Sequence, residues 1–250
     1  MRTGFLQGFA PGSMTGMAGK PDMKIVILTG AGVSAESGLS TFRDKDGIWT
    51  KVDLMEVATP EGFAKNPQKV LDFYNTRRKN AHGAEPNAAH YALARLQQNH
   101  AGEVVIATQN VDRLHFSAGS EALHMHGRHD QAWCTSCDAR WLAPDIMRLD
   151  DACPSCGEAT TRPDIVWFGE MPQYLDEIAR HLSEADLFAA IGTSGQVYPA
   201  AGFVSEARRF GARTVEINLL ASDLSDLFDD HVTGPATEAV PRWVAGILRG

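Results

Sequence analysis

A short apolar segment, Lys24-Ile-Val-Ile-Leu28, is followed directly by a glycine-rich turn. This junction limits the folds that the chain can adopt more than any other part of the sequence. A β-branched run bounded by turn residues is typical of a strand buried on both faces of a parallel sheet. Three further segments share this character, and stretches with helical spacing separate them. The predicted strands are residues 24–28, 103–108, 185–191 and 213–218, and the predicted helices are residues 66–79, 87–98, 173–183 and 201–210.

This alternation predicts an α/β fold, a Rossmann-like parallel sheet with helices on both faces. In such sheets, ligands bind in the crevice outside the carboxyl ends of the strands. Three of the predicted strands end in small or polar residues, at 30–32, 108–110 and 192–194. We therefore expect the functional cleft at this edge of the sheet.

Four cysteines form two pairs, Cys134-Thr-Ser-Cys137 and Cys153-Pro-Ser-Cys156, separated by fifteen residues. This spacing is typical of two knuckle turns that present four thiolates to one tetrahedral zinc ion. A site closed by four sulfur atoms leaves no position for a reactive water, so the zinc should be structural. The cysteines are then also excluded as catalytic nucleophiles.

Two segments interrupt the α/β pattern, and they predict the domain organisation. A cofactor loop and helical module at 38–87 and a zinc-binding module at 128–162 should pack together as a smaller domain, a zinc ribbon plus a helical insertion. The Rossmann-like domain would comprise residues 23–37, 88–127 and 163–250. Residues 1–22 are rich in Gly and Met and lack the basic and apolar parts of a signal peptide, so we expect a disordered extension.

The overall composition excludes several classes of partner. The chain has 250 residues and a net charge of −8, which disfavours nucleic acid. No apolar run approaches the roughly 18 residues of a membrane-spanning helix. We therefore expect no nucleic-acid or membrane partner and a cytoplasmic location.

The glycine-rich turn, Gly30-Ala-Gly-Val-Ser-Ala35, matches the G-x-G-x-x-A variant of the dinucleotide-binding turn. Its glycines allow the backbone to approach a pyrophosphate, whose negative charge is favoured at the start of a helix. The acidic residue that binds the ribose should follow about twenty residues later. Asp53 has this spacing but falls in the insertion rather than at a second strand end, which argues against a plain dehydrogenase.

Histidine is the natural acid–base residue near neutral pH. Spacing singles out His124 and His126, which precede Gly127 and the zinc module. If both lie on a strand, they share one face because they are two residues apart. The residues alone do not choose between them.

A longer series of motifs occurs in a fixed order along the chain. The motifs are Gly30-Ala-Gly-Val-Ser-Ala-Glu-Ser-Gly38, Thr41-Phe-Arg-Asp44, Thr108-Gln-Asn-Val-Asp112, His126-Gly127, the paired cysteines, Val166-Trp-Phe-Gly-Glu170, Gly192-Thr-Ser194, Ile217-Asn218 and Gly234-Pro-Ala236. This series resembles the sirtuin family, the NAD-dependent protein-lysine deacylases, over residues 23–250.

The resemblance implies an NAD-binding site and a role for each matching position. His126 would be the general base, helped by Asn110 and Asp112. The other residues implied in cofactor binding are Gly30, Ala31, Gly32, Ser34, Ala35 and Glu36 in the phosphate turn; Phe42, Arg43, Asp44 and Trp49 on a cofactor loop; Gln109 and Val111 at the nicotinamide; and Gly192, Thr193, Ser194, Asn218, Leu219, Leu220 and Ala236 near the adenosine. Residues 166–169 and 195–198, with Val166, Phe168, Gly169 and Val197, would flank a substrate peptide that adds as a strand.

The segment before residue 80 bears on which acyl group is removed. On a helix, Tyr74 and Arg77 share a face, and a phenol with a guanidinium can bind a carboxylate. This pair resembles that of the bacterial class that removes succinyl and malonyl groups. The small side chain of Ala58 would leave room for the longer acyl chain. The alternative interpretation of Tyr74 and Arg77 is an ordinary helix with a buried tyrosine and a surface arginine.

The resemblance therefore implies removal of succinyl, malonyl and also acetyl groups from lysine, giving nicotinamide, O-acyl-ADP-ribose and free lysine. The partners would be acyl-lysine proteins or peptides, and the protein would be a monomer. Three other functions remain open at this point: a protein mono-ADP-ribosyltransferase, a non-enzymatic zinc-ribbon module on a nucleotide-sensing domain, and a hydride-transferring dehydrogenase.

Overall fold

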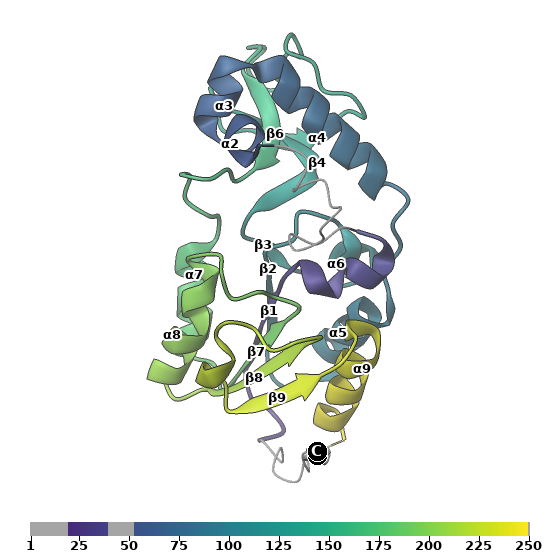
Figure 1. Ribbon diagram of the computed structural model, residues 1–250, viewed down its shortest axis with the longest axis vertical. Coiled ribbons are helices and arrows are strands. Elements are labelled where there is room, and N and C mark those ends of the chain that lie inside the picture. The colour runs from purple at the N-terminus through teal and green to yellow at the C-terminus, as the bar shows by residue number, and fades with distance from the viewer. Residues whose placement is uncertain (1–19, 40–52, 250) are drawn as a thin grey trace, which may run out of the picture.

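The computed structural model describes residues 20–39 and 53–249. Figure 1 shows a large sheet flanked by helices and, beyond its carboxyl edge, a smaller sheet packed beside the helices of residues 54–81. The strands are β1 (Ile25–Thr29), β2 (Val104–Thr108), β3 (Leu123–His124), β4 (Gly127–Cys134), β5 (Arg140–Leu142), β6 (Thr161–Ile165), β7 (Leu187–Ile191), β8 (Arg213–Asn218) and β9 (Asp230–Thr233). The helices are α2 (Leu54–Val57), α3 (Pro60–Lys65), α4 (Pro67–Ala81), α5 (Ala88–Asn99), α6 (Leu114–Ser117), α7 (Leu175–Ser183), α8 (Phe203–Arg209) and α9 (Ala236–Ile247).

The large sheet has the order β3-β2-β1-β7-β8-β9, and its neighbouring strands are parallel. The chain adds strands on one side of β1 and then crosses to the other side, beginning with β7. At such a reversal the connections leave in opposite directions, so a crevice forms at the carboxyl ends of the strands. The predicted α/β fold is confirmed, and each of the four predicted strands lies in this sheet.

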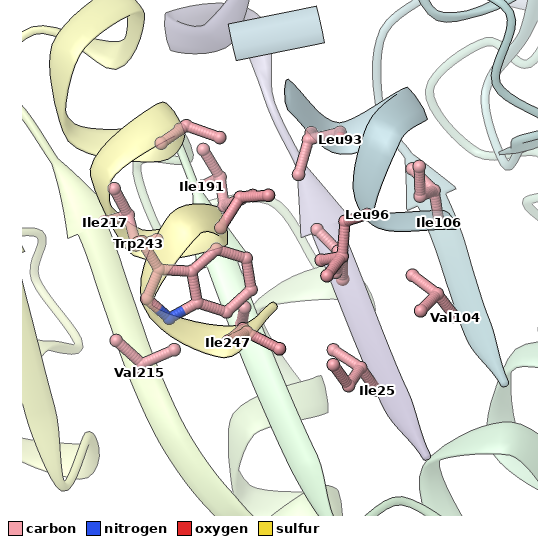
Figure 2. Packing of buried hydrophobic residues seen from close by; sticks show 14 of the residues in the cluster. Ile25, Leu93, Leu96, Val104, Ile106, Ile191, Val215, Ile217, Trp243 and Ile247 are labelled. Carbon is pink, nitrogen blue, oxygen red and sulfur yellow. The ribbon is translucent and has the colours of Figure 1, made fainter. Parts of the chain in front are cut away.

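Successive side chains of the buried strands point alternately into two separate hydrophobic cores, one on each face of the sheet. On one face, α5 and α9 cover the odd-numbered residues of β1, and Figure 2 shows Trp243 packed among aliphatic side chains. On the other face, α7 and α8 cover Val26 and Leu28. Each large apolar side chain removed from water stabilises the fold by about 1.5–3 kcal/mol. These two layers therefore hold the strand ends rigidly in place.

Local sequence explains where α4 and α5 begin. The side chain of Asn66 accepts a hydrogen bond from Lys69 N, and Pro67 occupies the first turn of α4. Asn87 caps α5 in the same way by accepting a hydrogen bond from Ala89 N, and His90 Nδ1 accepts a hydrogen bond from Asn87 N. The predicted helices at 66–79 and 87–98 are confirmed with small shifts at their ends.

The smaller sheet has the order β5-β4-β6, with antiparallel pairs. Helix α4 packs against it, since Leu71 lies in one apolar cluster with Ala132 and Met147. A side-chain hydrogen bond of 2.8 Å from Arg78 Nε to His129 O fastens the same helix to β4. We keep the division of the chain into a Rossmann-like domain and a smaller domain as a proposal.

Several element boundaries differ from the sequence expectation. Helix α7 begins at Leu175 rather than at residue 173, because Tyr174 adopts a left-handed backbone with φ of 61°. Helix α8 begins at Phe203, after a 3-10 turn at Ala200–Gly202. Strand β9 and helix α9 were not predicted, and Pro241 interrupts the helical signal inside α9. Within the described residues, no helix combines the length and apolarity needed to cross a membrane.

Candidate active site

The glycine-rich turn leaves β1 and packs directly on the end of β7. Gly30 N donates to Ile191 O at 3.0 Å, and Gly32 N donates to Gly192 O at 2.8 Å. A Cβ atom at Gly30 would lie 2.8 Å from Gly192 O, and one at Gly32 would lie 2.7 Å from Gly192 Cα. No side chain fits between these two strand ends, so the close packing of the turn on β7 requires glycine at both positions.

Asn110, Asp112 and Ser34 form one buried hydrogen-bonded group beside this turn. The Asn110 amide donates to Gly30 O and to Ser34 Oγ, each at 3.1 Å. Ser34 Oγ in turn donates to Asp112 Oδ2 at 2.9 Å. Burial raises the pKa of Asp112, while hydrogen bonds from Leu114 N and Ser34 oppose the shift. The group links the phosphate turn to the end of β2.

A second set of polar contacts crosses the strand ends toward β8. Gln109 Nε2 donates to Thr193 Oγ1 at 3.0 Å, and the Asn218 amide donates to Thr193 O at 2.7 Å. The ends of β2, β7 and β8 therefore share one connected polar edge. This is the edge at which the strand-end residues predicted the cleft.

His126 lies half-buried at the centre of this edge, between the two sheets. Its Nδ1 is 3.1 Å from Gln109 O, and a carbonyl oxygen can only accept a hydrogen bond. Nδ1 therefore carries the proton, and the unprotonated Nε2 is available as a base. Burial lowers the pKa of His126 below 6.5, so the ring is neutral at pH 7.

The other candidate, His124, ends β3 and is buried, with its Nδ1 3.0 Å from Asn110 O. The two histidines do not lie on one strand, because β3 stops at His124. His126 instead follows the strand, and its carbonyl accepts a hydrogen bond from Val166 N at 3.0 Å. The greater exposure of His126 favours it as the residue that meets a substrate.

The predicted acyl-binding residues gather in one apolar cluster between α4 and the segment after β6. Ala58, Tyr74 and Trp167 are buried in it, and Val111 packs against it. The Tyr74 hydroxyl accepts a hydrogen bond from Trp167 Nε1 at 3.0 Å, and burial raises its pKa. The Arg77 guanidinium carbon lies 5.9 Å from the centre of the Tyr74 ring. The phenol and the guanidinium therefore lie side by side, and Val111 packs against the cluster that holds the phenol.

Backbone hydrogen bonds join residues 166–169 to the segment between β3 and β4 and to the end of α2. Val166 N bonds to His126 O, and Phe168 N donates to Ala58 O at 2.9 Å. Phe168 and Gly169 are exposed, and Gly169 has a φ of 90°. Val197 is half-buried, and its carbonyl accepts a hydrogen bond from Ala201 N at 2.9 Å.

The four cysteine sulfur atoms lie together, all within 4.8 Å of one another. Two pairs approach more closely, Cys134–Cys156 at 3.7 Å and Cys137–Cys153 at 3.6 Å. Tetrahedral zinc with Zn–S bonds of about 2.3 Å places its sulfur atoms about 3.8 Å apart. The residues present therefore fit a closed structural zinc site, as the spacing predicted.

Some predicted cofactor residues lie elsewhere or have other contacts. Phe42, Arg43, Asp44 and Trp49, and the extension 1–19, lie outside the described residues. The Glu36 carboxylate accepts hydrogen bonds from Thr237 N and Thr237 Oγ1 at the start of α9. The remaining predicted positions are exposed or half-buried along the edge: Ala31, Ala35, Ser194, Leu219, Leu220 and Ala236. Asp53 is the N-cap of α2, so it is used in the fold of that helix.

A further group was missed by sequence reasoning. Arg162 is buried and pairs with Glu170 at 2.6 Å, while its guanidinium carbon lies 3.3 Å from the centre of the Trp167 ring. Glu170 Oε2 also accepts a hydrogen bond from Trp167 N at 2.8 Å. This group holds Trp167 in place within the apolar cluster that contains Ala58 and Tyr74. Only the motif around residue 166 could have pointed to it.

Comparison with known proteins shows the family to which the chain is similar. The sequence matches the Sir2 family over residues 30–199. It is 56% identical to the NAD-dependent protein deacylase of Caulobacter vibrioides, over 90% of this chain and 97% of that protein. It is 51% identical to the NAD-dependent protein deacylase of Bdellovibrio bacteriovorus, over 90% of this chain and 96% of that protein.

Solved structures of Sir2 homologues have the same fold as this chain. A Sir2 homologue in complex with NAD superposes with a TM-score of 0.82 at 38% identity, covering 92% of this chain and 91% of that one. A mutant Sir2 homologue in complex with ADP-ribose superposes with a TM-score of 0.84 at 37% identity, covering 92% of this chain and 94% of that one. By sequence, by fold and by the residues at the carboxyl edge of its sheet, this chain belongs to the Sir2 family.

Proposed function

We propose that the protein is an NAD-dependent protein-lysine deacylase that acts best on acyl groups ending in a carboxylate. Succinyl and malonyl groups would be preferred, and acetyl groups would also be accepted. The products would be nicotinamide, O-acyl-ADP-ribose and free lysine. Relatives that are about half identical along nearly their whole length bear the name NAD-dependent protein deacylase, which supports the general activity.

NAD supplies the ribose carbon from which nicotinamide leaves and to which the acyl oxygen is transferred. The chain's own residues bind and orient the reactants. Nε2 of His126 accepts the proton of a ribose hydroxyl, because Nδ1 is already committed to Gln109 O. Asn110 and Asp112 hold the ribose and the attacking water in place, since both lie in the buried group at the end of β2.

The observation that carries the acyl preference is the arrangement of Tyr74 and Arg77. Burial lowers the pKa of Arg77 only to about 10, so its guanidinium stays charged at pH 8. The guanidinium carbon lies 5.9 Å from the centre of the Tyr74 ring, so the charged group stands beside the phenol. A carboxylate at the end of an acyl chain would meet both the phenol and the guanidinium. Ala58 belongs to the same cluster, and its small side chain would leave space for the longer chain.

Arg77→Met tests this preference. A charge-assisted hydrogen bond contributes about 1.5–3 kcal/mol, so kcat/KM for a succinyl-lysine peptide should fall about ten- to a hundredfold. Deacetylation of the same peptide sequence should change much less. Lys79→Met, at an exposed position of the same helix, is the matched control and should leave both rates near wild type. Equal losses on the two substrates would contradict the proposed specificity.

Product analysis separates deacylation from ADP-ribosyl transfer to protein. Mass spectrometry of a reaction with NAD and a succinyl peptide should give O-succinyl-ADP-ribose and the unmodified peptide. An ADP-ribosylated protein, with the acyl peptide unchanged, would instead identify a mono-ADP-ribosyltransferase. The partners on the proposed function are acyl-lysine proteins, whose extended backbone would lie between residues 166–169 and 195–198.

A further inference from the structure

His129 lies on the strand that follows the catalytic base and has no role in the reaction described so far. Its backbone N donates to Val111 O at 2.8 Å, so it is fastened to the loop that lines the nicotinamide pocket. Within β4, Gly127 and His129 face inward, while Arg128 and Asp130 are less buried. The strand therefore directs the imidazole of His129 toward α4 rather than toward solvent.

The surroundings of His129 are those of the acyl-binding pair. The imidazole and the Tyr74 ring have their centres 6.4 Å apart. Burial, together with the positive charges of Arg77 and Arg78, holds the pKa of His129 well below 6.5. The nearest acid on the strand, Asp130, forms a two-pronged ion pair with Arg128 at 3.0 and 2.8 Å. His129 is therefore a neutral ring next to a positively charged helix face.

The ring also carries an unused polar atom. His129 is 7% exposed, and its Nδ1 has no hydrogen-bond partner among the residues that the structure describes. A buried polar atom without a partner is unfavourable, and in native proteins such an atom calls for an explanation. A hydrophobic side chain would fill the same place without this cost.

We propose that His129 is a third residue that recognises acidic acyl groups. When a succinyl or malonyl carboxylate lies between Tyr74 and Arg77, Nδ1–H of His129 donates a hydrogen bond to it. The neutral ring contributes a directional donor without adding a second charge beside Arg77. An acetyl group has no distal carboxylate and makes no use of His129. This inference rests on the proposed acyl specificity and adds a determinant to it.

The test compares His129→Leu with His129→Asn. Leucine and asparagine have nearly the same shape, but only asparagine can donate a hydrogen bond. We expect His129→Leu to raise KM for a succinyl peptide about tenfold with little change in kcat, and to change KM for the acetyl peptide less than twofold. His129→Asn should recover most of the loss. His82→Leu, at an exposed histidine that ends α4, controls for the substitution itself.

A double variant tests whether His129 and Arg77 act on the same carboxylate. In the Arg77→Met background, His129→Leu should have little further effect on the succinyl peptide, because the carboxylate is no longer held beside the ring. Equal behaviour of the Leu and Asn variants, or equal losses on the succinyl and acetyl peptides, overturns the inference in favour of a packing role. If the wild-type enzyme shows no preference for acidic acyl groups, the proposed function fails instead.

Discussion

The contact between the glycine-rich turn and the end of β7 predicts that Gly192→Ala strongly lowers the free energy of unfolding. Gly192 has a φ of 62°, and an added Cβ would lie 2.4 Å from Val33 N and 2.7 Å from Gly32 C. A left-handed backbone costs an alanine about 1–2 kcal/mol. Forcing the two backbones apart adds about 1–3 kcal/mol. We therefore expect a total loss of about 2–5 kcal/mol in the free energy of unfolding.

Two other glycines separate these contributions. Gly211 has a φ of 89° and nothing within 4 Å of an added Cβ, so Gly211→Ala should show the backbone cost alone. Gly83 has neither the positive φ nor a close neighbour, and Gly83→Ala should be nearly neutral. Thermal unfolding of the three variants should therefore rank Gly83→Ala, Gly211→Ala and Gly192→Ala in order of increasing loss.

The same substitution should affect NAD. Moving the end of β7 away from the turn displaces the backbone that approaches the phosphates, so the Kd for NAD should rise at least tenfold in Gly192→Ala. Gly211→Ala, far along the chain at the end of α8, should keep the wild-type Kd. Isothermal titration with NAD measures both. The reasoning is refuted if Gly192→Ala is no less stable than Gly211→Ala and binds NAD as tightly as the wild type.

Two further predictions concern histidines. His126→Ala should abolish turnover of an acyl peptide while the Kd for NAD changes little, because the base acts on a proton and the phosphate turn is untouched; near-normal turnover would exclude this role. Burial lowers the pKa of His90 from 6.5 to about 4, so the unfolded chain binds a proton more readily than the folded one between these pH values. Above pH 6.5 the titration of His90 does not lower the free energy of unfolding. As the pH falls from 6.5 toward 4, proton uptake by the unfolded chain lowers that free energy progressively. The thermal midpoint should therefore fall across this window, and more steeply than in a His90→Asn variant, which lacks the titrating ring.

The parts of the fold that could be predicted are those with a local signature. The strand at 24–28 contains a continuous apolar run from Ile25 to Leu28, and the strand at 213–218 contains the β-branched residues Thr214, Val215 and Ile217. Both strands lie inside the large sheet. The cysteine pairs could be interpreted from spacing alone, because a knuckle turn is a local structure. Each knuckle indeed has a residue with positive φ directly after its second cysteine, Asp138 in one and Gly157 in the other.

What could not be predicted depends on residues that are distant in the chain. The hydrogen bond between Trp167 and Tyr74 joins positions 93 residues apart, and the one from Thr237 to Glu36 spans 201 residues. In each pair, the sequence around one residue gives no indication of the other residue. His129 was missed for the same reason, since its surroundings are supplied by α4. Strand β9 was overlooked because its four residues, Asp230–Thr233, lack a clear apolar pattern.

The position of His126 explains how two separate sheets can serve one reaction. The residue follows β3 of the large sheet and precedes β4 of the small one. Its ring is held by Gln109 O at the end of β2, and its carbonyl is held by Val166 N just after β6. On the proposed mechanism, the first contact sets Nε2 as the basic nitrogen, and the second ties His126 to the segment proposed to bind the peptide. Because each contact joins His126 to a different sheet, a shift of one sheet against the other would misplace the proposed base even with every side chain intact.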